Sequence, residues 1–311
     1  MTDSPARPSG GWLHRFATLV AGCTFLLVIA GGLVTSTGSA LAVPDWPLSF
    51  GQVFPRMEGG VLFEHGHRMI AATVGVLTVV LAVWTAQVEQ RRSVRALGWT
   101  LVAVVVLQGV FGGVTVLLRL PTAVAVAHAG LAQVFFALTV VMATVTSPGD
   151  GRTGGRANGR TAATVGGVLA LATAVVLYAQ VLLGAVVRHT GAGLAIPDFP
   201  LAFGRLVPEF TNPLIVWQYA HRVGALASAV MIVWTAVGVL RRADRRFLRL
   251  PATLLLVLLG LQVFLGALTI WTLRAVVPTT AHVATGSLLF ATAVVLAVRQ
   301  AAGGLAHNFA R

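Results

Sequence analysis

Charged residues are scarce in this chain of 311 residues, lysine is absent, and cysteine occurs once. Only 10% of the residues are charged and 57% are hydrophobic, whereas soluble domains carry about 25% charged residues. This composition excludes an ordinary soluble protein and predicts an integral membrane protein. The single cysteine, Cys23, excludes an intramolecular disulfide. The apolar stretches are continuous and do not alternate with polar residues, so we expect helices and not membrane strands.

Long hydrophobic runs are abundant. Each is about 20 residues long, enough for a helix rising about 1.5 Å per residue to cross a hydrocarbon core of about 30 Å. We expect eight spans, at approximately 15–35, 67–88, 97–118, 122–146, 161–188, 217–240, 251–273 and 278–299. The first run is longer than the apolar part of a signal peptide and has no clear cleavage site after it, so we expect it to remain in the mature protein.

The net charge of +13 is carried by arginine, and its placement indicates membrane topology and not nucleic-acid binding. The arginines cluster in the loops after the second, fourth and sixth spans, in the segments EQRRSVRALG, GDGRTGGRANGR and RRADRRFLR. By the positive-inside rule these loops are cytoplasmic. We therefore expect a multi-pass protein of the cell membrane with both termini in the cytoplasm. The two longest loops, approximately 36–66 and 189–216, would then face outward.

An internal repeat covers most of the chain. The segment VTSTGSALAVPDWPLSFGQVFP, residues 34–55, returns as VRHTGAGLAIPDFPLAFGRLVP, residues 187–208, with 12 of 22 aligned pairs identical. The offset is 153 there and 154 further along, where it pairs Gln108 with Gln262. Chance does not produce this agreement, so the chain contains two copies of a unit of four spans.

Two such units predict an all-α membrane protein built as a tandem repeat of two four-helix bundles. The first unit comprises residues 1–146 and the second residues 161–311, joined by a cytoplasmic linker, 147–160, rich in glycine and arginine. Because four spans is an even number, both copies enter the membrane in the same direction. A pseudo-twofold axis is therefore expected along the membrane normal. A site in such a bundle would be built from side chains on facing helices.

The repeat divides the eight histidines into two groups. Matched positions near the outer ends of the even-numbered spans hold His67, His128, His221 and His282, whereas His14, His65, His189 and His307 have no counterpart. Ionisable residues within membrane spans are costly and usually functional. Two imidazoles facing each other across a bundle match the bis-histidine ligation of a b-type haem. The competing interpretation, histidines hydrogen-bonded to neighbouring helices, suits one histidine better than two matched pairs.

Other metal centres fit the sequence less well. Zinc would need three or four ligands close together, and no cysteine or carboxylate cluster supplies them. Copper sites draw on thiolate or thioether ligands, and the five methionines are not grouped with the histidines. Small residues near the histidines, as in GVFGGV and AHAG, would let a planar macrocycle approach the helices, although they also suit ordinary helix packing.

The two units differ beside their histidines. Glu64 lies three residues before His67 and would share a helix face with it, whereas the matched residue before His221 is Gln218. A carboxylate in a low-dielectric site can accept a proton or stabilise positive charge. The alternative is a solvated residue at the end of a span. The difference predicts that the first unit binds a substrate and that the second unit binds a cofactor.

Three kinds of polar residue near the histidines have distinct expected roles. Arg68 and Arg222 directly follow two of the histidines and are candidate partners for haem propionates, with interfacial anchoring as the alternative. Asp45 and Asp198 recur in the motif PDxPL and are expected to brace the outer loops through local backbone hydrogen bonds. His65 is not repeated, so we expect it to be a loop residue.

As a set, these features resemble the haem A synthase family of membrane enzymes, found in bacteria and mitochondria, that oxidise haem O. The resemblance covers nearly the whole chain and rests on the tandem four-helix repeat and on specific motifs. These motifs are the segments TGSALAVPDWPL and TGAGLAIPDFPL, the sequence Glu64-x-x-His67-Arg68, and His128, His221 and His282, one in each remaining even-numbered span.

The resemblance implies oxidation of the C8 methyl of haem o to a formyl group, which gives haem a for cytochrome oxidase. It implies that His67 and His128 ligate the substrate haem o, that Glu64 is catalytic, and that His221 and His282 ligate the iron of a haem b cofactor. Haem o would come from a haem O synthase through the membrane lipid, and electrons from an unidentified donor. Many family members carry a cysteine pair in an outer loop, and its absence here leaves a thiol-dependent step without support.

Three other classes compete with this interpretation. A diheme b-type electron-transfer protein, such as a quinol oxidoreductase subunit, would keep both haems permanently, and the difference between Glu64 and Gln218 argues against it. A transporter with parallel repeats gives no reason for four matched histidines. A haem farnesyl transferase would need aspartate-rich motifs for magnesium and diphosphate, and the aspartates in this chain are few and scattered.

Overall fold

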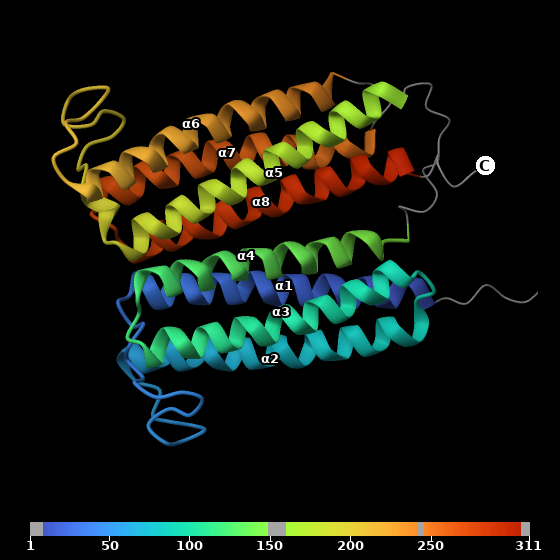
Figure 1. The fold of residues 1–311 in the computed structure, drawn as a ribbon, viewed down its shortest axis with the longest axis horizontal. Coiled ribbons are helices and arrows are strands. Elements are labelled where there is room, and N and C mark those ends of the chain that lie inside the picture. The colour runs from blue at the N-terminus through green and yellow to red at the C-terminus, as the bar shows by residue number, and fades with distance from the viewer. Residues whose placement is uncertain (1–8, 149–159, 242–245, 306–311) are drawn as a thin grey trace, which may run out of the picture.

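A computed structural model describes residues 9–148, 160–241 and 246–305, and eight long α-helices account for most of them (Figure 1). The first unit forms α1 (Ser9–Ser36), α2 (Gly59–Val88), α3 (Arg92–Leu117) and α4 (Thr122–Val145). The second forms α5 (Arg160–His189), the short 3₁₀ helix η1 (Ala192–Leu194), α6 (Pro213–Leu240), α7 (Arg246–Trp271) and α8 (Val276–Leu305). Most of the linker 147–160 and His307 lie outside the described residues.

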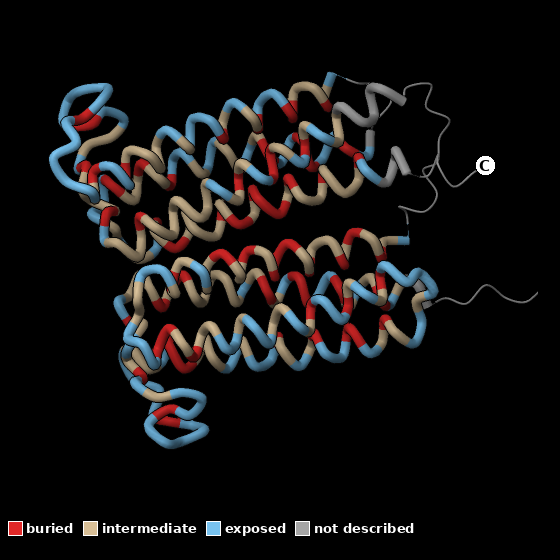
Figure 2. The backbone as a smooth tube through the Cα atoms, in the orientation of Figure 1, coloured by how far each residue is buried: buried red, intermediate tan, exposed pale blue. Residues whose placement is uncertain are grey.

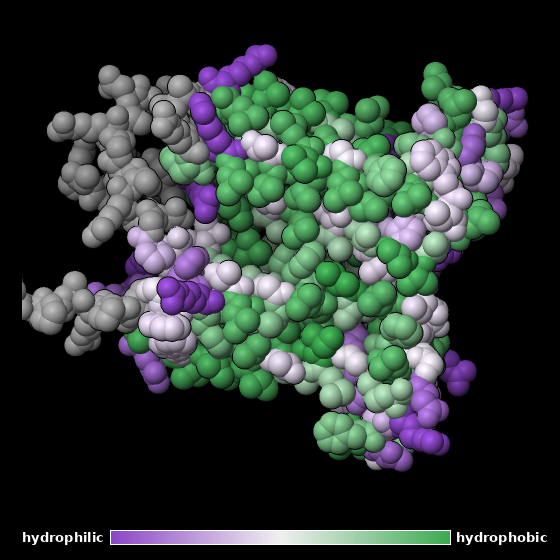
Figure 3. Space-filling view, turned by 180° about the vertical axis from the view of Figure 1, so that it is seen from behind, coloured by the Kyte–Doolittle hydropathy of each residue, from purple (hydrophilic) through white to green (hydrophobic). Residues whose placement is uncertain are grey.

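In the described part of the chain, eight helices are long and apolar enough to cross a membrane, which confirms the predicted all-α membrane class. Hydrophobic side chains cover the middle of the molecule, and polar side chains gather at its two ends (Figure 3). Buried positions lie where helices face one another, and exposed positions follow their outer sides (Figure 2). Large apolar side chains such as Leu226 and Val257 are exposed on those outer sides, as contact with lipid requires.

Most helices begin earlier than the hydrophobic runs predict, among them α2 at Gly59 instead of 67 and α6 at Pro213 instead of 217. The start of α6 is fixed by Asn212, whose Oδ1 accepts a hydrogen bond from the amide of Leu214 at 2.8 Å. In α2, the polar residues Glu64 and His65 of the early turns bond to the neighbouring loop, so hydropathy alone does not reveal that they are helical. His65 therefore lies in α2, and the expectation that it is a loop residue is wrong.

Each set of four helices forms a closed ring of neighbours. In the first bundle α1 and α3 both pack against α2 and α4, and in the second α5 and α7 both pack against α6 and α8. The bundles lie side by side, with α1 and α4 against α5 and α8 (Figure 1). At this junction Gln133 on α4 donates a buried hydrogen bond of 2.9 Å to Ser287 on α8, and the repeat offset of 154 makes these two residues counterparts. The pseudo-twofold axis itself stays a prediction.

The large apolar side chains fill the part of each bundle that lies away from the long loops. In the first bundle they include Val20, Leu81, Leu101 and Met142, and in the second Leu177, Ile232, Leu255 and Leu296. Burial of each such side chain contributes about 1.5–3 kcal/mol to folding. The part of each bundle next to the loops holds histidines and glycines instead.

The two long loops, 37–58 and 190–212, lie at the same end of the molecule, which we call the loop-bearing end (Figure 1). Each contains a tight turn held by a carboxylate. Asp45 accepts a hydrogen bond from the amide of Phe50 at 2.7 Å, and Asp198 one from Phe203 at 2.8 Å. These bonds confirm the predicted bracing role, and they hold the pKa of both carboxyl groups below the ordinary value for aspartate.

Candidate functional site

The four matched histidines all lie near the loop-bearing end, one in each even-numbered helix. His67 and His221 come eight residues after the first residues of α2 and α6, and His128 and His282 six residues after those of α4 and α8. All four helices start at the loop-bearing end, so the rings lie within the first three helical turns. The structure brings them into two pairs, one pair in each bundle.

Each of the four rings packs against a glycine of the preceding odd-numbered helix. We call these residues the contact glycines. A Cβ built on Gly31, Gly112, Gly184 or Gly266 would lie 3.1, 3.3, 3.2 or 3.1 Å from Cε1 of His67, His128, His221 or His282, respectively. Such separations are tighter than ordinary carbon contacts, so a side chain at these positions would push the imidazole out of place.

In the second bundle the two rings face each other, and their outer nitrogens are occupied. The centroids of His221 and His282 are 6.4 Å apart. A metal between two imidazoles separates their centroids by about 6 Å, because each bond is about 2 Å long and each nitrogen lies about 1 Å from its ring centre. His282 Nδ1 lies 3.1 Å from the carbonyl of Gln262, and His221 Nδ1 lies 3.0 Å from Nε2 of Gln180. Nε2 is then the nitrogen that each ring would offer to a metal, and on His282 this nitrogen also lies 3.4 Å from Nε2 of Gln262.

The first bundle makes fewer hydrogen bonds to its histidine rings. Nδ1 of His67 and Nδ1 of His128 are buried and have no hydrogen-bond partner among the described residues, whereas Nε2 of His128 lies 3.4 Å from Nε2 of Gln108. Leu27 occupies the position that matches Gln180, so the first bundle lacks that amide. The two pairs therefore share their contact glycines and differ in the partners of Nδ1.

Glu64 is buried, with 4% of its surface exposed, and lies within α2. Its Oε1 forms an ion pair with Arg68 Nη2 at 2.6 Å, and its Oε2 accepts the amide of Val43 at 2.8 Å. In the second bundle Gln218 accepts the amide of Ile196, the loop residue that matches Val43. Glu64 is therefore not a solvated residue at a helix end. The carboxylate and the amide hold their loops alike and differ in charge.

Arg68 and Arg222 bind the backbone of the two loops. Arg68 Nη1 donates to the carbonyls of Asp45 and Leu48 at 2.8 and 3.0 Å, and Arg222 donates to those of Asp198 and Leu201 at 2.8 and 2.7 Å. Each guanidinium thus fastens a loop to the helix that carries a histidine. The expected role of these arginines with haem propionates stays a prediction.

The sequence did not reveal how Trp46 and His65 contribute to the first bundle. The Trp46 ring packs on Gly113, the residue after one of the contact glycines, where a Cβ would come within 2.6 Å of the indole. His65 is buried, and its Nδ1 lies 2.8 Å from Ser49 Oγ in the same loop. In the second bundle Phe199 at the position of Trp46 instead meets Trp271 edge to face at 6.3 Å. The first loop therefore packs more closely over its bundle.

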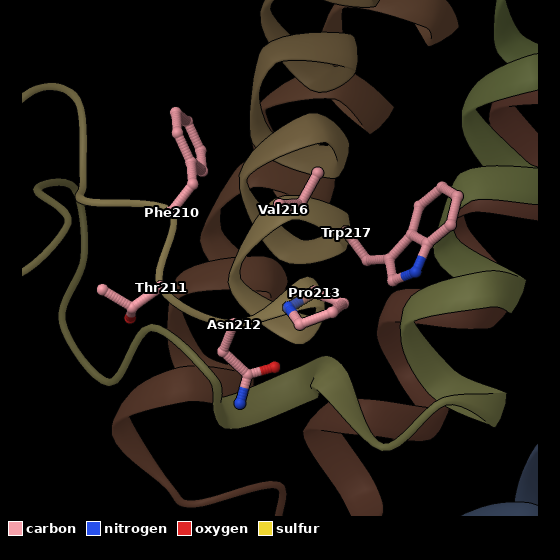
Figure 4. Close-up of a pocket in the computed structure, with 6 residues that line it drawn as sticks. All are labelled: Phe210, Thr211, Asn212, Pro213, Val216 and Trp217. Atoms are coloured by element: carbon pink, nitrogen blue, oxygen red, sulfur yellow. The ribbon is translucent and has the colours of Figure 1, made fainter.

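A hollow lies on the surface at the start of α6 (Figure 4). It is lined by Phe210, Thr211, Asn212, Pro213, Val216 and Trp217. It contains no ionisable side chain and none of the matched histidines, so it offers no metal ligand. The described residues also contain no group of three or more histidine, cysteine or carboxylate side chains that could hold a metal ion. A metal group held by two histidines fits the chain better than a zinc centre does.

Comparison with known proteins gives consistent matches over most of the chain. Residues 57–294 match the family described as cytochrome oxidase assembly protein. The chain is 32% identical to a haem A synthase of Symbiobacterium thermophilum over 250 residues, which cover 78% of this chain and 80% of that protein. It is 29% identical to a haem A synthase of Alkalihalophilus pseudofirmus over 285 residues, 89% of this chain and 94% of that protein.

Proposed function

Because the chain belongs to the family of cytochrome oxidase assembly proteins, whose members include haem A synthases, we propose that it is a haem A synthase. The observation that carries this proposal is the buried carboxylate of Glu64, three residues before a histidine of the first pair. In both pairs, each imidazole packs against a glycine of the preceding helix. A permanent two-haem electron carrier has no need for an ionisable group in one bundle only.

The proposed reaction is oxidation of the C8 methyl of haem o to a formyl group by successive hydroxylations and loss of water, with an external oxidant supplying the oxygen atom, and it gives haem a. Side chains alone do not oxidise an unactivated methyl group, and bound haem iron supplies that chemistry. The contribution of the protein is to bind the haem and to orient it. His67 and His128 would hold haem o in the first bundle, and Gly31 and Gly112 leave room for Cε1 of each imidazole to approach the neighbouring helix.

Glu64 is the proposed catalytic residue. Arg68 and the amide of Val43 fix both oxygens of its carboxylate, so the negative charge stays in one place. A fixed carboxylate stabilises positive charge that develops nearby and can accept a proton. The protein can thus offer a negative charge beside haem o without moving a side chain.

The second bundle is the proposed cofactor half. His221 and His282 hold haem b, and Gln180 and Gln262 orient the two rings. The neutral Gln218 replaces Glu64, so this bundle lacks the charged group beside its histidine. Electrons would reach the first bundle from this half, and they would come from a donor that is not yet identified.

Haem o is a large apolar molecule, and we propose that it enters from the lipid bilayer after its synthesis by a haem O synthase. Its product would serve the assembly of cytochrome oxidase. We propose the cell membrane as the location. The arginine-rich loops would be in the cytoplasm and the loop-bearing end outside.

Expression in a host that makes haem o but lacks its oxidation tests the proposal. We expect haem a in pigment extracts separated by chromatography. His67→Ala should abolish haem a. His14→Ala should retain it, because His14 bonds to Ala143 at the opposite end of the first bundle. Folded, haem-loaded protein that makes no haem a would contradict the proposal, and extracts with haem b alone would point to a diheme electron carrier.

A further inference from the structure

Arg188 is a charged residue near the end of the membrane-spanning helix α5, at the junction of the two bundles. Its Nη2 donates to the carbonyl of Gly32 at 2.5 Å and to Ser36 Oγ at 2.9 Å, both on α1. Thr280 of α8 donates to the same Ser36 oxygen at 3.0 Å. Arg188 therefore lies where α1, α5 and α8 meet, partly buried between the bundles.

No carboxylate balances this charge in the described part of the chain. The ion pairs found there join Arg56 to Glu58, Arg68 to Glu64, Arg91 to Glu89 and Arg205 to Glu209. Asp45 and Asp198 bond to backbone amides of their own loops. A cation within a membrane span usually faces a functional partner, because leaving it unpaired is costly. Arg188 thus has no carboxylate partner among the described residues, and its position favours an anionic ligand.

The position of Arg188 relates it to the second histidine pair. Gly184, which contacts His221, lies four residues earlier on the same face of α5. Thr280, which shares Ser36 with Arg188, lies two residues before His282 on α8. Arg188 is therefore about one helical turn from the segments that present both imidazoles of the second bundle.

The first bundle has no such cation. The repeat offset of 153 pairs Arg188 with Thr35, which bonds to the carbonyl of Gly31 within its own helix. The arginines that both bundles share, Arg68 and Arg222, donate to the carbonyls of their loops. Only the second unit therefore carries a cation at this position.

We propose that Arg188 binds a propionate carboxylate of the haem held by His221 and His282, an inference that rests on the proposed function. Among the described residues, the recorded hydrogen bonds of Arg188 come from Nη2 alone. Nε and Nη1 are left to form the paired, charge-assisted bonds that a guanidinium makes with a carboxylate. The second bundle then retains its haem, whereas the first bundle, with Thr35 at this position, releases its haem more readily.

Haem titration of the purified full-length protein tests the assignment. The titration uses a His67→Ala/His128→Ala background, so that only the second bundle takes up haem, and follows the absorbance of haem b and of its dimethyl ester. The ester has the same ring and iron but no carboxylate. Arg188→Met should weaken haem b binding by about tenfold or more, the value of a hydrogen bond to a charged group. It should leave binding of the ester unchanged, and Arg188→Lys should keep part of the preference for haem b.

Gln133→Leu is the matched control, because it removes the junction hydrogen bond to Ser287 without changing a charge. It should affect haem b and the ester alike. Equal losses for both ligands in Arg188→Met would show that Arg188 only holds the bundles together, and would overturn the assignment. Failure of the background protein to take up either ligand would instead contradict the proposed haem site itself.

Discussion

At the scale of single residues, Glu64 and Gln218 perform the same mechanical task with a different charge. Each accepts the amide of a matched loop residue, Val43 in the first bundle and Ile196 in the second. The two side chains have nearly the same size and reach. The loops are therefore held in the same way, and a substitution between the two types separates the role of the charge from the role of the fold.

Glu64→Gln should leave the fold and the haem content intact, because glutamine can accept the Val43 amide as Gln218 accepts that of Ile196. Haem a formation should fall by about 10²-fold or more, as expected for the loss of a group that handles protons or charge in the reaction. The measurement is haem a formed per haem-loaded protein. Gln218→Glu is the control, and unchanged haem a in Glu64→Gln would refute the catalytic role.

The sequence alone identifies most of the proposed site at this scale. The repeat picks out His67, His128, His221 and His282 from eight histidines, and its one conspicuous difference points to Glu64. It does not reveal Arg188, because this residue neither recurs nor follows a histidine. The contacts of Arg188 join positions 156 and 152 residues away in the chain, which no local pattern can show.

At the scale of helix pairs, the contact glycines separate two explanations that the sequence leaves open. Small residues could serve general helix packing or the approach of an imidazole. On α7, one glycine contacts an imidazole and another does not. Gly266 contacts His282, whereas a Cβ on Gly260 would meet nothing within 4 Å. A pair of substitutions in one helix can therefore distinguish them.

Gly266→Ala should lower the haem content of the purified protein, because the new methyl group would lie 3.1 Å from Cε1 of His282 and displace the ring. Gly260→Ala should leave haem content unchanged and stabilise the helix by about 0.5–1 kcal/mol, the usual gain when alanine replaces glycine. Haem absorbance per protein and thermal unfolding measure the two effects. Equal haem loss in both variants would argue for general packing.

At the scale of the loops, Asp45 and Asp198 make the turns sensitive to acid. Their pKa values in the folded protein are lowered, chiefly by hydrogen bonds from the amides of Gly51 and Phe50 and of Gly204 and Phe203. Their stabilising contribution is complete above the ordinary aspartate pKa of about 4. It is lost as the pH falls through the lower pKa of the folded state.

We therefore expect the amides of Phe50 and Phe203 to be protected from hydrogen exchange at neutral pH and to lose protection below about pH 4. Asp45→Asn should remove this pH dependence at Phe50 only, because an amide does not titrate, and Phe203 serves as the internal control. The measurement is the protection factor, corrected for the intrinsic rate at each pH. Protection at Phe50 that falls with pH in the variant as it does in the wild type would refute the explanation.

The boundaries of the helices show what hydropathy predicts well and what it does not. All eight spans are present, because a bilayer demands long apolar helices whatever else the sequence encodes. Hydropathy does not predict the first turns of α2, because Glu64 and His65 are polar. Their partners, the amide of Val43 and the hydroxyl of Ser49, lie in a loop that folds back onto the helix. Only the tertiary structure supplies that pairing.

At the scale of the whole molecule, two bundles of similar helix arrangement differ in the hydrogen bonds made to Nδ1 of their histidines. The second bundle orients its imidazoles through Gln180 and Gln262, and its Arg188 lies at the junction with α1, four residues after the glycine that contacts His221. The first bundle leaves Nδ1 of both histidines without a partner in the described structure. A resident group requires a site like that of the second bundle. A substrate that must enter and leave requires a site like that of the first bundle.

This difference predicts how haem is retained in protein from a host that makes haem b but no haem o. The wild type should retain haem b through purification, and His221→Ala should lose most of it, because a ring that hydrogen bonds already orient is the stronger ligand. His67→Ala should keep the haem b spectrum unchanged, since its bundle serves the substrate. Haem absorbance per protein before and after washing with apomyoglobin, which captures released haem, measures retention. If His67→Ala and His221→Ala lost haem equally, the two bundles would have to be equivalent sites, and the division into a substrate half and a cofactor half would be wrong.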